Sequence, residues 1–395
     1  MAELINVLQL IFDFQIEGTG GGVTRFACEL ARALDRAEFA PQICGLWHHG
    51  TQLEQNLIDD LNREGIPAFT VTPWNPHNPY QGFWDALQFL QQKLSRKTEL
   101  IIHSHSEFAD MAALALKFTG HSPFILRTVH YGYKYEWRKR PLRRLLLTNF
   151  LYPLFFTQEI GVSQAIVDRL NHRPIARITG EKGLYLNNAV NLERFQSSKI
   201  DRNTLKQKYH LPENQPIIGS VGRLTEQKGY TYFIEAIAQV ARQEPELFVI
   251  LIGEGELRPE IEAQVRNYGL EEQVRLLGSR PDVLDLLVCM DLFVSSSLWE
   301  GLPTVIMESL AAGIPVVATA IPGTQDLISP RVNGWLADAG DSQDLAKQIL
   351  LALNDPVKRK KFSAAGQQTI QGFSISSVAE KHARLYRELI RSHEK

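Results

Sequence analysis

The chain has 395 residues, of which 44% are hydrophobic and 22% are charged, and its formal net charge is −2. This length favours two domains, each with its own core, and the near-neutral charge gives no sign of a nucleic-acid partner. The three cysteines, Cys28, Cys44 and Cys289, form no CxxC pair and are typical of buried thiols in a reducing compartment.

The first residues, MAELINVLQLIF, are typical of a strand and lack the basic segment and small-residue cleavage site of a signal peptide. No apolar run reaches the roughly 18 residues that a membrane span needs. We therefore expect a cytoplasmic protein. Peripheral attachment to the cytoplasmic face of the inner membrane stays open because of a basic segment described below.

Apolar runs alternate with helical patterns along the chain, which predicts parallel sheets covered by helices. In the first half, a helix is expected at 23–34 and strands at 6–12, 100–103, 124–128 and 159–162. In the second half, strands are expected at 217–221, 248–252, 274–276, 292–295 and 315–318. The predicted fold class is α/β, with two doubly wound, Rossmann-like domains facing each other across a cleft at the carboxyl ends of their strands.

A polar stretch at 196–212 marks the expected domain boundary. It gives an N-terminal domain at 1–196 and a C-terminal domain at 197–373. The last segment, 374–395, is predicted to form a helix that is polar on one side.

Two carboxylates stand eight positions apart in Glu300-Gly-Leu-Pro-Thr-Val-Ile-Met-Glu308. Gly301 and Pro303 interrupt regular structure, and proline suits the first turn of a helix, so a helix is predicted at 304–312. Its N-terminus would offer free N–H groups to a phosphate, and each carboxylate could accept two hydroxyl hydrogen bonds from a sugar diol. Two solvated glutamates at an ordinary strand–helix junction would show the same spacing.

A second motif, Gly222-Arg-Leu-Thr-Glu-Gln-Lys228-Gly229, follows the strand expected at 217–221. Arg223 could hold a phosphate with two parallel hydrogen bonds, and Lys228 would add a mobile cation. Together they could neutralise a diphosphate leaving group, unless they are merely two solvated bases in a turn. The Gly-x4-Gly-Lys-Ser/Thr pattern of a P-loop is absent.

With the following Gly313-Ile-Pro-Val-Val317, these motifs resemble the retaining glycosyltransferases of family 4, also called glycosyl transferases group 1, which have the GT-B fold. The resemblance covers nearly the whole chain, is strongest at 221–336 and is weaker at 40–95. It implies that 1–196 is the acceptor-side domain, that 197–373 binds the nucleotide sugar, and that the helix at 374–395 crosses back to the N-terminal domain. It implies transfer of a hexosyl unit, with retention, from a UDP- or GDP-sugar to a hydroxyl acceptor. It also implies no cofactor beyond the donor and no catalytic metal, because Arg223 and Lys228 would replace the divalent ion.

The resemblance assigns catalytic roles to Glu300, His130, Arg223 and Lys228, with Glu308 on the ribose hydroxyls. Two further turns, after the strands at 248–252 and 274–276, match family segments near the nucleotide. The donor is expected to contact Gly21, Gly22, Gly222, Arg223, Lys228, Gly253, Glu254, Gly278, Ser279, Arg280, Gly301, Leu302, Pro303, Thr304, Val305 and Glu308.

The N-terminal half carries a glycine-rich loop, Gly18-Thr-Gly-Gly-Gly22, before its first helix. A dinucleotide enzyme is disfavoured because Val23 or Arg25 occupies the place of the third glycine in Gly-x-Gly-x-x-Gly. Arg25 is expected to contact phosphate or acceptor, or only to solvate its helix.

Histidines end two strands of this half. The resemblance places His130 at the donor hexose and puts His105 and Tyr131 on the acceptor side, whereas His103 is expected to point into the sheet. His105 could equally be a buried wall residue. The HEXXH and Cys/His patterns of zinc sites are absent.

The segment Lys134–Arg144 contains six cations and one anion, interleaved with aromatic residues and followed by the apolar run 145–152. It could lie on an anionic membrane surface, bind a phosphate-bearing soluble acceptor, or be a solvated loop. The predicted acceptor is lipid-linked or an oligosaccharide.

By family analogy, the setting is the synthesis of envelope polysaccharide, lipopolysaccharide or glycolipid. A GT-B nucleotide-sugar epimerase, a sugar phosphorylase and a non-catalytic nucleotide-sugar-binding protein remain as alternatives. The intact set of Glu300, Glu308, Arg223 and Lys228 argues against the non-catalytic protein.

Overall fold

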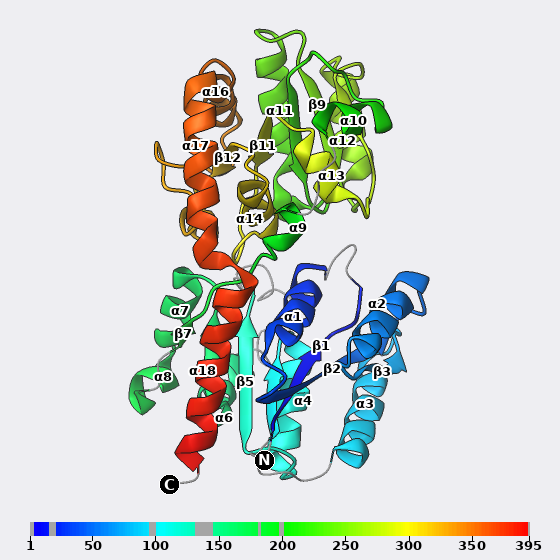
Figure 1. Ribbon diagram of the computed structural model, residues 1–395, viewed down its shortest axis with the longest axis vertical. Helices are drawn as coiled ribbons and strands as arrows, with labels where there is room; N and C mark the ends of the chain where they lie inside the picture. Colours follow the sequence, from blue (N-terminus) through cyan, green and yellow to red (C-terminus); the bar gives the residue numbers. More distant parts are fainter. Residues whose placement is uncertain are drawn as a thin grey trace. The chain divides into compact units, whose positions relative to one another are not determined.

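The computed structural model describes residues 4–15, 21–94, 100–130, 145–180, 183–196 and 201–393, and the chain divides into two compact units (Figure 1). Unit 1 contains Met1–Asn188 and Ile375–Lys395, and unit 2 contains Ala189–Ser374. The boundary expected after residue 196 lies inside unit 2. The amide of Val190 donates to the carbonyl oxygen of Phe373 at 2.9 Å, so the chain joins unit 2 earlier than its polar composition suggests.

The described part of unit 1 contains a parallel sheet of seven strands in the order β3-β2-β1-β4-β5-β6-β7. The strands are β1 (Ile5–Ile11), β2 (Phe39–His48), β3 (Ala68–Pro73), β4 (Leu100–Ser104), β5 (Phe124–Val129), β6 (Gln158–Gly161) and β7 (Leu184–Tyr185). The four strands expected here are confirmed to within a residue or two, whereas β2, β3 and β7 were not expected. Leu8 and Leu10 of β1 pack towards α3 and α4, while Val7 packs towards the C-terminal helix, so helices cover both faces.

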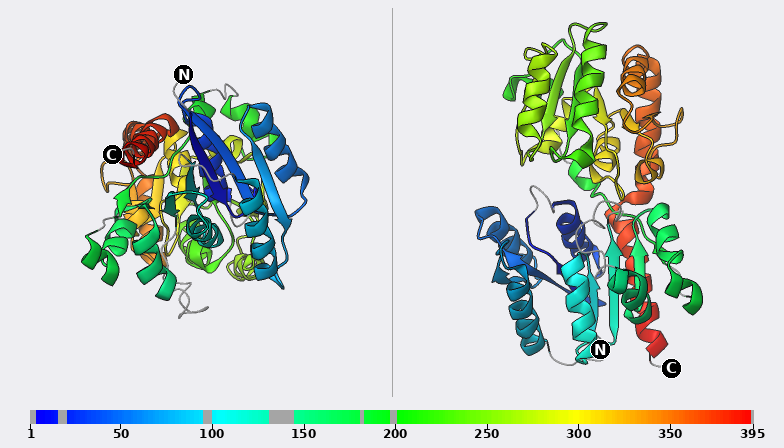
Figure 2. Two further views of the ribbon diagram at one scale, coloured as in Figure 1. Left: turned by 90° about the horizontal axis from the view of Figure 1, so that it is seen from below. Right: turned by 180° about the vertical axis from the view of Figure 1, so that it is seen from behind.

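The helices of unit 1 include α1 (Gly21–Ala33), α2 (Gln52–Arg63), α3 (Pro79–Lys93), α4 (Glu107–Phe118), the π-helix η2 (Leu147–Leu151), α6 (Tyr152–Phe155), α7 (Gln164–Asn171), α8 (Pro174–Thr179) and α18 (Ile375–His393). Helix α18, red in Figures 1 and 2, packs beside α1. It buries Ala383 and Tyr386 against the sheet. Arg387 fastens it further, because its guanidinium donates two hydrogen bonds to the Glu38 carboxylate, at 2.7 and 2.8 Å.

A cluster of buried charges lies between α4, β5, β6 and the start of α8. The guanidinium of Arg127, 2% exposed, pairs with Asp110 at 2.7 Å and Glu159 at 3.1 Å, and Arg173 pairs with the same Glu159. Arg173 also donates to the carbonyl oxygen of Thr148 at 2.8 Å. The cluster therefore ties the helical segment 147–155 to the sheet.

The described part of unit 2 contains a parallel sheet of six strands in the order β10-β9-β8-β11-β12-β13. Its strands are β8 (Ile217–Val221), β9 (Phe248–Ile252), β10 (Val274–Leu276), β11 (Leu292–Ser295), β12 (Val316–Thr319) and β13 (Trp335–Ala337). The sequence predicted the first four with the observed bounds and β12 one residue early, and it missed β13. The helices include α9 (Glu193–Gln196), α10 (Arg202–Lys208), the 3-10 helix η3 (Glu226–Lys228), α11 (Tyr230–Ala241), α12 (Arg258–Asn267), α13 (Val283–Val288), α14 (Thr304–Ala311), α15 (Pro322–Gln325), α16 (Ser342–Leu353), α17 (Pro356–Thr369) and the 3-10 helix η4 (Ile370–Phe373).

Each sheet reverses its strand order once. In unit 1 the reversal lies between β1 and β4, and in unit 2 it lies between β8 and β11. At such a reversal, the loops after the two neighbouring strands run in opposite directions and leave a crevice between them. Open α/β sheets bind their ligands in this crevice, beyond the carboxyl ends of the strands. The loops after β8 and β11 contain Lys228 and Glu300, so the fold brings the two sequence motifs of unit 2 to the same place.

Within the part of the chain that the structure describes, no helix is long and apolar enough to cross a membrane.

Candidate functional site

The centre of the candidate site in unit 2 is an ion pair between the loops after β8 and β11. The Nζ of Lys228 lies 2.5 Å from Oε1 of Glu300, and the two side chains are only 18% and 7% exposed. Ser297 donates to the same carboxylate oxygen at 3.0 Å, and Gln227 donates to Oε2 at 3.2 Å. Three donors from two loops therefore fix the position of the Glu300 carboxylate, and this carboxylate fixes the Lys228 ammonium.

The two loops are also joined through their backbones. The amide of Leu298 donates to the carbonyl oxygen of Gln227 at 2.8 Å, and Ser296 Oγ donates to that of Lys228, also at 2.8 Å. Gly229 has φ +61°, and a Cβ there would overlap the carbonyl oxygen of Ser296. Only glycine permits this conformation and this approach. Both residues of the Lys-Gly pair therefore have a structural role: Lys228 pairs with Glu300, and Gly229 allows the two loops to touch.

Three glycines expected near the nucleotide form a ladder beyond the ends of adjacent strands. Gly222 follows β8 and donates to the carbonyl oxygen of Ile252 at 2.9 Å, and Gly253 follows β9 and donates to that of Gly278, after β10, at 2.8 Å. Gly253 has φ +141° and Gly278 has φ +71°. The loops after β8 and β9 thus pack backbone against backbone, with the Lys228 side chain against Gly222 and the Glu254 side chain against Gly278.

Two charged residues of this group are engaged within unit 2. The carboxylate of Glu254 pairs with Arg258, and the guanidinium of Arg280 donates to both oxygens of Asp282, at 2.8 and 2.7 Å. These bonds to Arg280 hold the pKa of Asp282 below its usual value. Ser279, next to Arg280 in the sequence, is exposed.

Arg223, by contrast, is partly buried in the β8 loop, and its guanidinium makes no hydrogen bond or ion pair with the described residues. It therefore differs from Lys228, whose ammonium is already paired.

The segment Gly301–Val305 crosses from the β11 loop into α14. Pro303 is the N-cap residue, and no side chain caps the helix. Gly323, at the start of α15, approaches so closely that a Cβ there would overlap the carbonyl oxygen of Gly301. Glu308 lies one turn inside α14 and is 9% exposed. The helix predicted at 304–312 is thus confirmed, ending one residue earlier.

A cluster of four histidines occupies the carboxyl ends of the strands in unit 1. His103 and His105 come from β4 and its end, His130 follows β5, and His382 comes from α18. The rings of His103 and His105 lie 4.4 Å apart between centroids, and those of His105 and His130 lie 5.5 Å apart. Phe26 of α1 packs edge-on against both His105 and His130.

His103 points into the protein, as the sequence predicted, and hydrogen-bonds Tyr386 and Thr128, both at 2.7 Å. Burial lowers the pKa of all four histidines, to about 3 for His130 and about 4 for His382. The four rings are therefore neutral near pH 7. The Asn188 side chain opposes part of this fall in the pKa of His130.

Sequence reasoning missed Gln9, His382 and Tyr386, which complete this cluster. Gln9 interrupts the apolar run 7–12 of the first strand, and it is completely buried. His382 and Tyr386 stand four residues apart on the inner face of α18. An isolated buried amide was the signal that could have pointed to this site.

The remaining predicted residues of unit 1 are less informative. Gly21 and Gly22 form the first turn of α1 and not part of the preceding loop, because the helix begins two residues earlier than expected. Arg25 lies in the second turn and is partly buried. Tyr131, Gly18 to Gly20 and the basic segment 134–144 lie outside the described residues.

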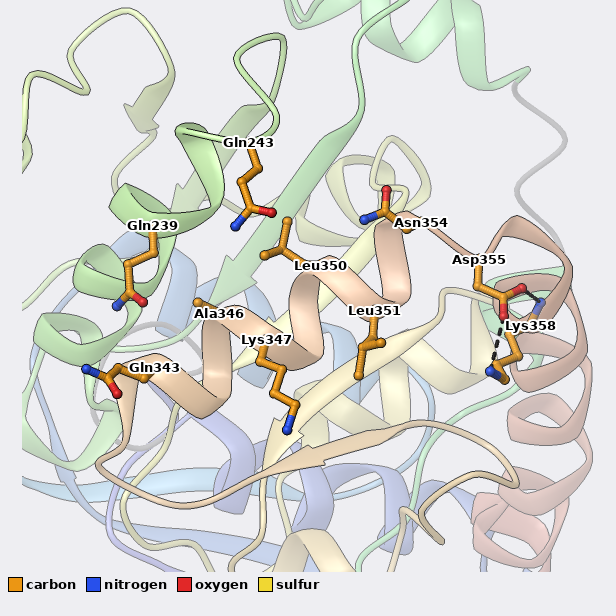
Figure 3. Close-up of a pocket in the computed structure, with 10 residues that line it drawn as sticks. All are labelled: Gln239, Gln243, Gln343, Ala346, Lys347, Leu350, Leu351, Asn354, Asp355 and Lys358. Atoms are coloured by element: carbon orange, nitrogen blue, oxygen red, sulfur yellow. Dashed lines mark hydrogen bonds and ion pairs between the residues drawn. The ribbon is translucent and has the colours of Figure 1, made fainter.

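Figure 3 shows a pocket of about 510 Å³ on the helices of unit 2. It is lined by the end of α11, one side of α16 and the start of α17: Gln239, Gln243, Gln343, Ala346, Lys347, Leu350, Leu351, Asn354, Asp355 and Lys358. No residue of the candidate site lines it. Within the described residues there is also no group of three or more His, Cys, Asp or Glu side chains arranged to hold a metal ion.

Two family models together match most of the chain. Residues 20–194 match Glycosyltransferase Family 4, and residues 201–369 match Glycosyl transferases group 1. An Escherichia coli UDP-Gal:alpha-D-GlcNAc-diphosphoundecaprenol alpha-1,3-galactosyltransferase is 26% identical over 85% of this chain and 88% of its own. The lipopolysaccharide core biosynthesis glycosyltransferase LpsE of Rhizobium meliloti is 33% identical over 45% of this chain, which spans about half (52%) of LpsE.

Solved structures share the fold at low identity. Anabaena HepE in complex with UDP and glucose superimposes with a TM-score of 0.80 at 22% identity, covering 97% of this chain and all of HepE. Sucrose-phosphate synthase from Thermosynechococcus elongatus gives a TM-score of 0.81 at 19% identity, covering 98% of this chain and all of the synthase. With its two Rossmann-like α/β units of GT-B type, this chain belongs to the family 4, group 1 glycosyltransferases.

Proposed function

We propose that this glycosyltransferase moves a hexosyl unit from a UDP- or GDP-sugar to a hydroxyl group, with retention, in the synthesis of envelope polysaccharide, lipopolysaccharide or glycolipid. The observation that carries the proposal is the Lys228–Glu300 pair at the strand-order reversal of unit 2, beside the closely packed glycine turns at Gly222, Gly253 and Gly278. The E. coli and Rhizobium relatives support the setting, and the UDP complexes of HepE support a nucleotide-sugar donor.

In the proposed reaction, the acceptor hydroxyl oxygen bonds to the anomeric carbon on the face from which the diphosphate leaves. The bond between that carbon and the β-phosphate oxygen breaks, and its electron pair goes to the nucleoside diphosphate. The leaving phosphate oxygen takes the proton of the acceptor hydroxyl. Arg223 and Lys228 would neutralise the charge that grows on the diphosphate.

No divalent ion enters this scheme, and we therefore propose that turnover is independent of metal. Transfer should continue unchanged in excess EDTA. A loss of activity that added Mg²⁺ or Mn²⁺ restores would contradict this part of the proposal.

The donor site is tested by melting curves with UDP, GDP, ADP and dTDP. A ligand that binds only the folded state raises the melting temperature, so the nucleotide of the true donor should stand out. Glu308→Ala should weaken that binding 10- to 100-fold, because a lost hydrogen bond between a charged group and a hydroxyl costs about 1.5–3 kcal/mol. Exposed Glu271, changed to alanine in the same unit, is the matched control.

The outcomes separate the existence of a donor site from the role of Glu308 at the ribose. Equal shifts in the wild type and Glu308→Ala would remove Glu308 from the ribose while leaving the donor site standing. No shift with any nucleotide would overturn the donor proposal. Turnover of a nucleotide sugar without acceptor would favour the epimerase, and reversible use of free phosphate would favour the phosphorylase.

We also propose that unit 1 associates with anionic membranes. The helical segment 145–155 leaves Leu146 58% exposed and Leu154 47% exposed, and Leu145 and Phe150 are also exposed. It follows directly on the basic segment 134–144 in the sequence. Apolar side chains next to a run of cations are typical of interfacial binding.

Co-sedimentation with phosphatidylglycerol vesicles tests this association. Reversing Arg138, Arg140 and Arg143 to glutamate should weaken binding more than 100-fold, since each cation near such a surface contributes about 1 kcal/mol. The control reverses three exposed lysines of unit 2, Lys347, Lys358 and Lys360. Equal binding by both triple variants, or equal binding to phosphatidylcholine vesicles, would contradict the electrostatic model.

A further inference from the structure

Three segments of unit 1 that are far apart in the sequence expose apolar side chains on adjoining helices. They are the segment 145–155, the end of α4 and the short helix α8. Phe118, the last residue of α4, is 60% exposed, and Ile178 of α8 is 80% exposed. Among the described residues, no other large apolar side chain is as exposed as Ile178. Large apolar side chains that gather at a protein surface indicate an interaction partner.

Direct contacts join the three segments. The rings of Phe118 and Phe155 lie 4.8 Å apart between centroids, and Lys117 Nζ donates to the carbonyl oxygen of Phe155 at 2.7 Å. Helix α8 packs against both η2 and α6. Arg173, the N-cap residue of α8, donates to the carbonyl oxygen of Thr148 at 2.8 Å. The exposed apolar side chains are therefore held on one framework.

The charges near these side chains are mostly positive. None of the stretches 114–124, 145–155 and 174–180 contains an acidic residue. Arg177, next to Ile178 in the sequence, is exposed, and so is Arg169 on α7, beside the exposed Asp168. Apolar side chains accompanied by cations fit an anionic bilayer, because its acyl chains accept the first and its headgroups pair with the second.

A second copy of the chain fits this surface less well. In a two-fold dimer the same surface meets itself, so the Arg177 side chains of both copies would approach each other. Like charges brought together across an interface oppose association, whereas anionic headgroups attract them.

We infer that α8 and the end of α4 contact an anionic lipid bilayer together with the segment 145–155, and that Ile178 enters the apolar boundary of the bilayer. The inference rests on the membrane association proposed above and extends it to two helices outside the basic and apolar stretch 134–155. It also adds a contribution of another kind, because salt screens the attraction between exposed charges but not the burial of an apolar side chain.

Co-sedimentation of the full-length protein with vesicles of equal parts phosphatidylglycerol and phosphatidylcholine tests this contact. Ile178→Asn should lower the partition coefficient about 10- to 100-fold, the loss expected when one large apolar side chain no longer leaves water. The factor should be similar at low and moderate salt, unlike that of the arginine reversal. Val357→Asn is the matched control, because Val357 is 78% exposed on α17 of unit 2. It should leave partitioning unchanged.

A fluorescent probe at position 178 reports the contact directly. Cys28, Cys44 and Cys289 are all buried, so in Ile178→Cys a polarity-sensitive maleimide probe reacts at position 178. Its emission should move to shorter wavelength when the vesicles are added, because the probe enters an apolar medium. The same probe in Val357→Cys should show no shift.

Equal partitioning of Ile178→Asn and Val357→Asn, with no emission shift at position 178, would overturn the inference. The proposed association would still stand if the arginine reversal weakened binding. A wild-type protein that binds none of these vesicles would reject the association itself, and this contact with it. A dimer that forms without vesicles and that Ile178→Asn dissociates would assign the surface to a second copy and overturn the inference as well.

Discussion

Replacing Lys228 with methionine is expected to lower kcat by about two to three orders of magnitude, the usual cost of removing one preorganised donor from a developing negative charge. The same change leaves the Glu300 carboxylate, 7% exposed, without its cation. Breaking a buried ion pair by removing one partner costs about 3–5 kcal/mol of unfolding free energy. Because Ser297 and Gln227 still donate to Glu300, we expect about 3 kcal/mol, measured by urea denaturation.

Lys358 provides the control, because its pair with Asp355 is a lysine–carboxylate pair of the same unit with 58% and 36% exposure. Lys358→Met should change stability far less than Lys228→Met, because water screens an exposed pair, and it should leave transfer unchanged. The double variant Lys228→Met with Glu300→Gln should be more stable than Lys228→Met alone, since no unpaired charge remains. Additive losses of stability in the double variant would show that the two side chains are not coupled.

Gly253→Ala should unfold or displace the β9 loop and abolish nucleotide binding. A Cβ at this position would lie well under 3.0 Å from the carbonyl oxygen of Gly222, a separation that real Cβ atoms essentially never show. The obstacle is backbone and not a flexible side chain, and φ is +141°, which L-residues rarely adopt. Backbone strain and overpacking together place the expected loss of unfolding free energy at about 3 kcal/mol or more.

Gly269→Ala separates strain from overlap. Gly269 also has a positive φ, +68°, but a Cβ there would meet nothing within 4 Å. This variant should lose only the cost of the left-handed conformation, about 1–2 kcal/mol, and should bind nucleotide normally. The measurements are denaturation and the thermal shift with the nucleotide that the wild type binds. Similar losses in both variants would mean that contact between the β8 and β9 loops is unimportant.

Strand positions in unit 2 were predicted almost entirely from the sequence. Ile217–Val221, Phe248–Ile252 and Leu292–Ser295 are short apolar runs bounded by turn residues, and the bounds agree with the structure. Strands buried on both faces need such continuous runs, so the signal is strong. β3 was missed because Ala68–Pro73 has no continuous apolar run. This strand is only half-buried, and two of its six residues are threonines.

The domain boundary and the start of the first helix differ from the sequence-based expectations for another reason. The chain joins unit 2 at Ala189 because Val190 pairs beside Ser374, and this contact spans almost the whole second unit. Likewise, α1 starts at Gly21, although glycine disfavours helices, because the helix is held by its packing against β1, β2 and α18. Both depend on partners that are distant in sequence.

The sequence by itself determined the α/β class, most of the strands and the two motifs with Lys228 and Glu300. Each of these depends on apolar periodicity or on turn-forming glycine and proline within a short segment. Only the tertiary structure decided which charges of distant segments meet: Lys228 is held by Glu300, 72 positions further along the chain. It also decided that Gln9 reaches both His105 and Tyr386. Strand order and helix packing set such contacts, and residues 377 positions apart carry no local signal of their meeting.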